Sequence, residues 1–271
     1  MTKICSFDEK ITTPAFAGTS RLYGEMGMAR LANMHVTIIG IGGVGSWSSE
    51  ALVRTFVGNI CLIDLDDICI SNINRQIHTT TNSVGQLKVD AMKERLLSIN
   101  PNCNIETKLD FVNKENLESL IPKQTDYVID AIDNAKVKAH LIAYCKRNRI
   151  KIITTGGAGG QIDPLKVTCS DLNKSWQDPL SAKVRNELRR KFGFSRNPKR
   201  NYGVQCIYST EQIRYPNANG EVSYAKQKDK NSNKLDCSQG LGASVMVTSS
   251  FGMMAAANVV NNLLSDIKPV D

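Results

Sequence analysis

The residues best suited to chemistry stand in one short stretch of the chain, residues 35–76. An apolar, β-branched run, Val36–Ile39, leads into a G-x-G-x-x-G pattern and then into a helical pattern. Glycines in such a loop allow a tight turn and a close approach of the backbone to a polyphosphate, and the helix that follows offers free N–H groups to the anion. We therefore expect this loop to bind nucleotide phosphates. Its glycines are Gly40, Gly42, Gly43 and Gly45.

Polar and charged residues follow the next predicted strand. Asp64 lies 19 residues beyond Gly45, near the usual spacing for a carboxylate that binds a ribose hydroxyl. Two cations, Arg75 and Lys88, come after it. They suit a triphosphate whose pyrophosphate departs, whereas a nicotinamide cofactor has no need of them. The side chains expected at the nucleotide are Asp64, Asp66, Asn72, Arg75, Gln76 and Lys88.

The elements that must position these residues alternate regularly along the first half of the chain. Strands are predicted at 36–40, 59–64, 105–110, 126–131 and 150–155, and helices at 44–57, 84–98, 113–121 and 134–148. This alternation predicts an α/β fold, a Rossmann-like and mostly parallel sheet with helices on both faces. Ligands bind such sheets at the carboxyl ends of the strands, where the motifs above lie.

The second half is polar and strand-rich. Strands are predicted at 163–171, 204–209 and 211–215, a helix at 180–192, and loops at 195–205 and 217–239. We expect residues 1–160 to form the nucleotide-binding domain with a helical lead-in. Residues 161–271 would form a smaller extension whose last helix packs on the first domain.

Composition narrows the class of protein. The chain has 271 residues, a net charge of +8 and eight cysteines, and it begins with the charged sequence MTKICSFDEK. A signal peptide would be apolar there, so we expect a cytoplasmic protein with reduced thiols. No cysteine pair has C-x-x-C spacing, so zinc is not expected.

Positive charge gathers in the second half of the chain. From Lys183 to Arg200 there are eight lysines or arginines and one acid, Glu187. Such a run is either a solvated face or a surface that neutralises nucleic-acid phosphates. A different segment, between Asp236 and Asp266, carries no charge. Polar residues interrupt it, so we expect a helix packed on the sheet rather than a membrane span.

The motifs together resemble a known family. The glycine loop, the nucleotide side chains above and the sequence Asp130-Ala-Ile-Asp133-Asn134 are similar to the adenylating domain of the ubiquitin-activating-enzyme-like family, which includes activators of molybdopterin and thiazole sulfur carriers. Four further segments resemble one branch, the enzymes that dehydrate threonylcarbamoyladenosine in tRNA. They are NRQIH (74–78), TTGGAGGQIDP (154–164), QDPL (177–180) and LDCSQGLGA (235–243).

This resemblance implies an ATP-dependent enzyme. It would adenylate the threonyl carboxylate of the modified adenosine beside the anticodon and close a ring with net loss of water. Asp133 matches the ligand of Mg²⁺ and Arg75 a catalytic cation. We expect Asp130 instead to be structural and to cap the end of its strand. Arg21 matches an arginine that reaches the ATP of a partner subunit, which implies a homodimer. In the basic run, the residues expected to bind tRNA are Arg185, Arg189, Arg190, Lys191, Arg196, Lys199 and Arg200.

Two residues and one loop each have two possible roles. Cys237 matches a cysteine that forms a thioester in related activators, but a small buried residue is an equal alternative. His78 is either an acid–base group or structural. The Gly156–Gly160 loop either connects two elements or lines a site for Na⁺ or K⁺. The resemblance also suggests a cysteine desulfurase and its sulfur-acceptor protein as partners.

Two rival functions remain. An activator of a ubiquitin-like sulfur carrier would adenylate a protein C-terminus, but the missing C-x-x-C pairs and the basic second half count against it. A non-catalytic or NAD-binding module explains the glycine loop but leaves Arg75, Lys88 and Asp133 without a role.

Overall fold

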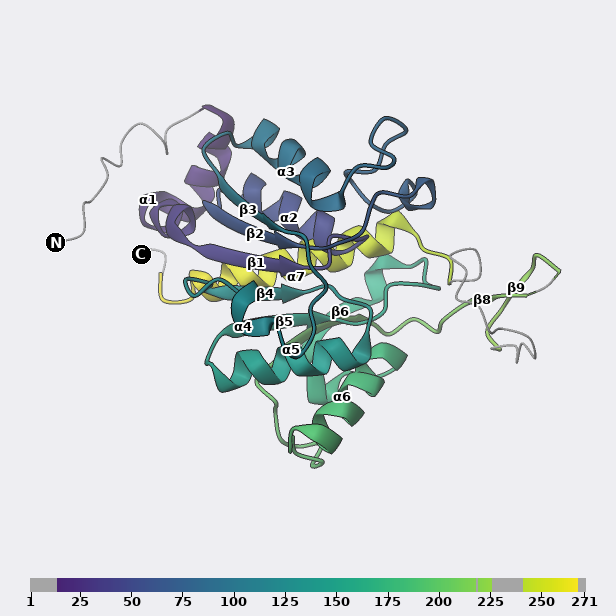
Figure 1. The fold of residues 1–271 in the computed structure, drawn as a ribbon. Coiled ribbons are helices and arrows are strands. Elements are labelled where there is room, and N and C mark those ends of the chain that lie inside the picture. Colours follow the sequence, from purple (N-terminus) through teal and green to yellow (C-terminus); the bar gives the residue numbers. More distant parts are fainter. Residues whose placement is uncertain (1–13, 218, 226–240, 268–271) are drawn as a thin grey trace.

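A seven-stranded sheet forms the centre of the molecule (Figure 1). The computed structural model describes residues 14–217, 219–225 and 241–267. The strand order is β3-β2-β1-β4-β5-β7-β6, and every neighbouring pair is parallel except β6 with β7. The strands are β1 (His35–Ile39), β2 (Asn59–Ile63), β3 (Asn104–Lys108), β4 (Tyr127–Asp130), β5 (Lys151–Thr155), β6 (Val167–Asp171) and β7 (Gln205–Ser209). The predicted α/β fold with a mostly parallel sheet is confirmed.

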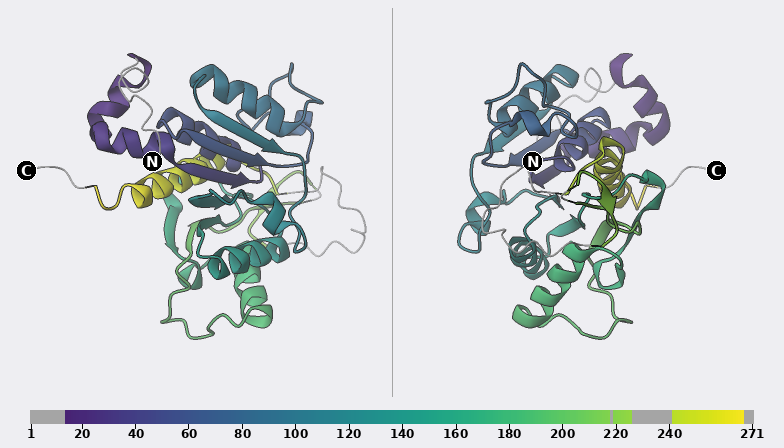
Figure 2. Two further views of the ribbon diagram at one scale, coloured as in Figure 1. Left: turned by 60° about the vertical axis from the view of Figure 1, so that its left-hand side comes forward. Right: turned by 90° about the vertical axis from the view of Figure 1, so that its right-hand side faces the viewer.

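Helices cover both faces of the sheet (Figures 1 and 2). One apolar core joins alternate strand residues to α2 (Gly45–Arg54), α3 (Lys88–Ile99) and α7 (Val245–Leu263). The other joins the opposite strand residues to α4 (Leu117–Leu120), α5 (Ala135–Arg147) and α6 (Pro179–Lys191). Because side chains alternate between the two faces of a strand, a strand buried on both sides is nearly all apolar, as in Val36–Ile39, where Thr37 is polar and its hydroxyl is hydrogen-bonded to that of Thr125.

Helix α1 (Ala17–Asn33) lies at the end of the sheet where the parallel strands begin (Figure 1). Its last turn is tied there, since the carbonyl of Leu31 accepts a hydrogen bond from the backbone N–H of Gly58 at 3.0 Å. The helix is kinked at Gly24, where φ is +68°. Helix α1 therefore lies at the end of the sheet opposite the carboxyl ends of the parallel strands.

Several boundaries differ from those predicted. The helix predicted at 84–98 begins at Lys88, because Gly85 takes a φ of +86° in the preceding turn. The strand predicted from residue 163 begins at Val167, because Asp163 caps a short 3₁₀ helix, Pro164–Lys166. In place of the strand predicted at 211–215, a small hairpin joins β8 (Tyr215–Pro216) to β9 (Val222–Ser223).

The second half of the chain contributes to the same sheet as the first. β7 pairs with β5, and β6 closes the edge of the sheet beside β7. Helix α7 packs against α2 on the first half of the sheet. No helix in the described ranges is both long enough and apolar enough to cross a membrane.

Candidate active site

The glycine loop turns from β1 into α2 at the carboxyl end of the sheet. Gly40 has a φ of +89°, and a Cβ there would lie 2.9 Å from the carbonyl oxygen of Ala131. A Cβ on Gly45 would lie 1.9 Å from the carbonyl oxygen of Gly40. Both positions therefore need glycine, and the loop can bring its backbone close to a phosphate at the start of α2.

Asp64 ties this loop to the second strand. Its Oδ2 accepts a hydrogen bond from the backbone N–H of Ile41 at 2.6 Å, and its Oδ1 accepts one from that of Asp66 at 2.9 Å. Asp66 is exposed, and its Oδ2 lies 2.6 Å from the buried ammonium of Lys88. Lys88, the first residue of α3, is thus linked to the glycine loop through Asp66 and Asp64.

Arg75 lies across the glycine loop. A Cβ on Gly43 would lie 3.3 Å from Cγ of Arg75, and the indole N–H of Trp47 donates to the carbonyl oxygen of Arg75 at 3.0 Å. Its guanidinium donates to the carbonyl oxygen of Ser71 at 2.7 Å and to Oδ1 of Asn74 at 3.0 Å. The stem of the side chain thus packs on Gly43, and hydrogen bonds within its own segment fix the guanidinium.

The two predicted amides are buried beside the same loop. Asn72 closes the turn before Arg75, since its Oδ1 accepts from the backbone N–H of Cys69 at 3.1 Å. The Nε2 of Gln76 is 3.8 Å from where a Cβ on Gly42 would stand. Asn72 therefore fixes the turn that leads to Arg75, and Gln76 lies against the glycine loop.

Asp133 occupies the turn between β4 and α5. It is exposed, whereas Asp130 at the end of β4 is fully buried and paired with Lys138 at 3.0 Å. Within the described ranges, no three His, Cys, Asp or Glu side chains cluster as a metal site. Mg²⁺ commonly binds one or two carboxylates together with nucleotide phosphates and waters. A single exposed carboxylate facing solvent beside the phosphate loop fits that donor set.

His78 and Cys69 are titratable groups near this site. Burial, with the positive charges of Lys88 and Arg95, lowers the pKa of His78 from 6.5 to about 4, so its ring is neutral at pH 7. A hydrogen bond from Ser71 Oγ lowers the pKa of the exposed Cys69 thiol. Sequence reasoning singled out His78 but not Cys69, whose exposure no sequence pattern signals.

The Gly156–Gly160 loop packs on the start of α6. Oδ2 of the buried Asp178 accepts from the backbone N–H of Gly157 at 2.8 Å, and its Oδ1 accepts from that of Ser181 at 2.6 Å. A Cβ on Gly156 would lie 2.4 Å from that carboxylate. Oε1 of Gln161 is buried and has no hydrogen-bond partner among the described residues.

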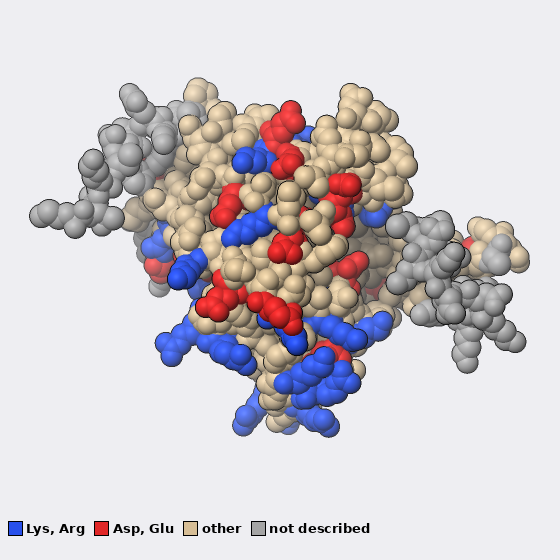
Figure 3. Space-filling model, in the orientation of Figure 1, with Lys and Arg blue, Asp and Glu red and all other residues tan. Residues whose placement is uncertain are grey.

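The basic run divides into two groups. Arg185 donates to Ser175 Oγ, and Arg189 donates to Tyr202 Oη at 2.9 Å and to Oδ1 of Asn173 at 2.8 Å, so both are partly buried and support the fold. The others are exposed and gather over α6 and the segment after it, at the bottom of Figure 3. They are Lys183, Arg190, Lys191, Arg196, Lys199 and Arg200.

Not every predicted site residue lies near the glycine loop. Asp64, Arg75 and Gln76 each contact the glycine loop, and Lys88 is paired with Asp66. Arg21 is exposed on α1, at the opposite end of the strands (Figure 1). Cys237 lies outside the described residues.

Comparisons with known proteins agree with the motifs. The ThiF family model matches residues 17–269. A tRNA threonylcarbamoyladenosine dehydratase from Escherichia coli is 46% identical over 250 residues, which cover 92% of this chain and 93% of that protein. The dehydratase of the same name from Haemophilus influenzae is 45% identical over 264 residues, which cover 97% of both.

A solved structure extends the comparison to three dimensions. The crystal structure of the E. coli tRNA N6-threonylcarbamoyladenosine dehydratase in complex with ATP has a TM-score of 0.82 and 44% identity, and the match covers 93% of this chain and 94% of that one. The match of the family model and these two relatives each span more than nine-tenths of the chain. The chain belongs to the ThiF family.

Proposed function

We propose that this protein is an ATP-dependent tRNA threonylcarbamoyladenosine dehydratase. The observation that carries the proposal is the assembly of the glycine loop, Arg75 and Lys88 at the carboxyl end of the sheet. This set serves a nucleoside triphosphate better than a dinucleotide. Near-complete coverage of the named dehydratases, one of them with ATP bound, supports the substrate assignment.

The proposed reaction has two steps, adenylation of the carboxylate and closure of the ring. The substrate carboxylate attacks the α-phosphorus of ATP, pyrophosphate leaves, and the carboxyl becomes a mixed anhydride with AMP. The carbamoyl group of the same nucleoside then attacks the acyl carbon, and AMP leaves as the ring closes. Because the nucleophile is intramolecular, its effective concentration is high and no enzyme thioester is required. Cys237 is then dispensable for the ring closure.

The residues of the site have separate tasks in this scheme. Backbone N–H groups at the start of α2 bind phosphate oxygens, and Arg75 and Lys88 balance the charge that develops on the pyrophosphate. Asp64 holds the loop and the nucleotide ribose. Asp133 would hold Mg²⁺, which when bound neutralises phosphate charge.

The exposed basic residues on and after α6 are our candidates for the tRNA surface. A protein that neutralises backbone phosphates needs clustered cations, and Figure 3 shows them gathered on one part of this face. Arg185 and Arg189 belong to the predicted set but are partly buried in hydrogen bonds, so we assign them a supporting role there.

Further partners remain proposals. Arg21 would act on the ATP of a second copy, because it lies at the opposite end of the strands within its own chain. The unpartnered Oε1 of Gln161 supports a monovalent cation at the Gly156–Gly160 loop. A cysteine desulfurase with its acceptor protein, and a cytoplasmic location where tRNA is modified, complete the proposal.

The direct test is incubation with ATP, Mg²⁺ and tRNA that carries threonylcarbamoyladenosine, followed by mass spectrometry of the nucleosides. We expect a nucleoside lighter by one water. A nucleoside of unchanged mass, together with pyrophosphate exchange stimulated by a Gly-Gly-tailed protein, would instead favour the sulfur-carrier activator.

A further inference from the structure

A buried ion pair lies directly beneath the turn that carries Asp133. The side chain of Lys138 is 1% exposed and that of Asp130 is 0% exposed, and Nζ lies 3.0 Å from Oδ1. Removing two charges from water is costly, and a buried pair adds little net stability over apolar residues of the same size. A pair kept in such a place therefore points to a positional task.

Lys138 binds the backbone of the turn as well as the carboxylate. Its ammonium donates to the carbonyl oxygen of Ile132 at 2.8 Å and to that of Asp130 at 3.2 Å. With the carboxylate, these acceptors satisfy the three protons of the ammonium. Lys138 thus reaches back from the first turn of α5 and holds the carbonyls on the N-terminal side of Asp133.

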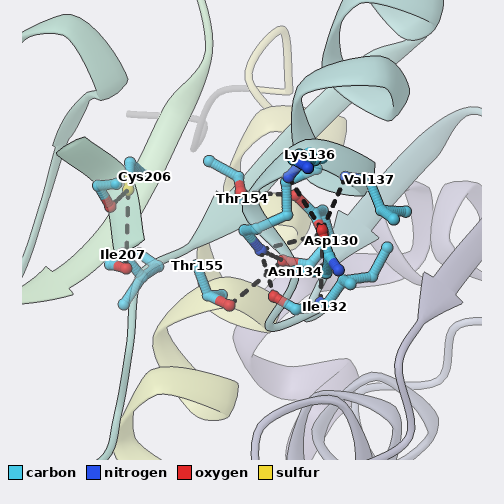
Figure 4. A network of polar contacts seen from close by, with 11 residues as sticks. Asp130, Ile132, Asn134, Lys136, Val137, Thr154, Thr155, Cys206 and Ile207 are labelled. Atoms are coloured by element: carbon cyan, nitrogen blue, oxygen red, sulfur yellow. Dashed lines mark hydrogen bonds and ion pairs between the residues drawn. The ribbon is translucent and has the colours of Figure 1, made fainter. Parts of the chain in front are cut away.

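Asp130 fixes the same turn from the strand. Its Oδ1 accepts from the backbone N–H of Ile132 at 3.2 Å, and its Oδ2 accepts from Thr154 Oγ1 at 2.6 Å (Figure 4). On the other side, Oδ1 of Asn134 accepts from the N–H groups of Lys136 and Val137 and caps α5. Both neighbours of Asp133 are therefore fixed, while its own side chain faces solvent.

The turn is also in contact with the phosphate loop. Gly40, with its φ of +89°, packs so closely on Ala131 that a Cβ would lie 2.9 Å from the carbonyl oxygen. A change in the path of residues 131–134 would therefore move Asp133 relative to the nucleotide phosphates.

We propose that Lys138 is a positioning residue, which with Asp130 holds the β4–α5 turn so that Asp133 meets the metal on the nucleotide. The inference rests on the proposed function, since it assumes that the site takes ATP with Mg²⁺. Groups that orient a metal ligand from behind commonly contribute about 10- to 100-fold to metal affinity.

The test is calorimetric titration of ATP, with and without Mg²⁺, into the wild-type chain and Lys138→Met. In the variant we expect the gain in ATP affinity that Mg²⁺ provides to fall by about 10- to 100-fold, while metal-free ATP affinity changes little. If Lys138→Met does not fold, Asp130→Asn with Lys138→Met removes both charges, and the same loss is expected.

A double-mutant cycle separates positioning from general destabilisation. If Lys138 acts through Asp133, then Asp133→Asn with Lys138→Met loses no more of the Mg²⁺ gain than Asp133→Asn alone. The matched control is Arg95→Met, which removes a partner of the buried Glu50 on α2. It should lower the thermal midpoint and leave the Mg²⁺ gain intact.

Three outcomes would decide against the inference. The positioning role would be overturned if the folded Lys138→Met variant kept the full Mg²⁺ gain, if the losses in the cycle were additive, or if Arg95→Met lost as much. In each of these cases Mg²⁺-dependent ATP binding by the wild-type chain would leave the proposed function standing. A wild-type chain whose ATP affinity ignores Mg²⁺ would overturn metal-assisted adenylation at this site, and the inference with it.

Discussion

At the residue scale, burial sets the chemistry of His78. The residue is 5% exposed, and neither ring nitrogen has a hydrogen-bond partner among the described residues. The neighbouring cations Lys88 and Arg95 add to the cost of protonation and hold its pKa at about 4. An imidazole with a pKa of about 4 is a weak base, and its buried nitrogens contact no donor or acceptor among the described residues, so a structural role fits His78 better than proton transfer.

This pKa predicts an acid-sensitive fold. In the unfolded chain His78 is protonated below about pH 6.5, whereas in the folded chain it is protonated only below about pH 4. The free energy of unfolding therefore falls as the pH falls through that window. The loss from this one group approaches about 3 kcal/mol, at about 1.4 kcal/mol per pH unit. Denaturant unfolding of His78→Asn from pH 7 to pH 4 should show a flatter profile than wild type. His140→Asn, on α5, is the control, and an identical slope in all three proteins would contradict the assignment.

Asp133 carries a second prediction at this scale. Asp133→Asn should lower turnover on the order of 100-fold while the circular dichroism spectrum stays unchanged, because the neutral amide is a poorer ligand for Mg²⁺. Asp266→Asn, an exposed change just beyond the end of α7 that removes the ion-pair partner of Arg30, controls for the loss of a carboxylate. Near-normal turnover in Asp133→Asn would remove that residue from the metal site.

At the scale of elements, the contact of α7 with α2 supports the phosphate loop. A Cβ on Gly252 would lie 2.6 Å from the carbonyl oxygen of Val44 and 2.7 Å from Cβ of Trp47. Val44 directly precedes α2, and Trp47 holds the backbone of Arg75. Helix α7 therefore packs directly against the start of α2, which borders the proposed nucleotide site.

Gly252→Ala should accordingly destabilise the protein by about 1–3 kcal/mol, the usual cost of overpacking, and weaken ATP binding. Gly242→Ala is the matched control, because a Cβ there would meet nothing within 4 Å. Denaturant unfolding and ATP titration of both variants give the comparison. Equal stability of the two variants would show that the helices separate without cost.

The predictability of the elements follows the same physics. The buried strands and the glycine loop carry strong local patterns, so β1, β2, β4 and β5 and the place of the loop before α2 could be predicted. The strands β6 and β7 could also be predicted, but their antiparallel pairing and the 3₁₀ turn at Pro164–Lys166 could not. Edge pairing and a cap by Asp163 decide these two features, and neither leaves a periodic signal in the sequence. Lys138 resembles any helix lysine until the fold shows that it faces inward.

At the scale of the whole molecule, the nucleotide site and the exposed basic surface lie on different elements. The exposed cations on and after α6 gather at the bottom of Figure 3, whereas the phosphate loop lies between β1 and α2. A tRNA would have to reach both, because its backbone needs the cations and its modified base needs the ATP. Phosphate contacts position a nucleic acid, while specific groups read the base.

Only the exposed residues of the basic run are suitable for testing tRNA binding by mutation. Replacing Arg196, Lys199 and Arg200 by Ala should weaken tRNA binding and reduce the log–log salt slope by up to about 1 per lost contact, with ATP affinity unchanged. Arg189 is left intact, because its hydrogen bonds to Tyr202 and Asn173 support the fold.

The control removes the same charge elsewhere, from the exposed Lys114, Lys123 and Lys151. Filter binding at several salt concentrations measures both triple variants. If the two lose affinity equally, net charge rather than this surface attracts tRNA.

The central claim is that this site adenylates a carboxylate, and an oxygen label tests it most directly. The substrate is tRNA whose threonylcarbamoyl carboxylate carries ¹⁸O at both oxygens, incubated with ATP and Mg²⁺. Because a carboxylate oxygen bonds to the α-phosphorus and leaves with it, we predict AMP that contains one ¹⁸O and a cyclised nucleoside that retains the other. Cyclised nucleoside with unlabelled AMP, or with ADP and phosphate in place of AMP, would contradict the account.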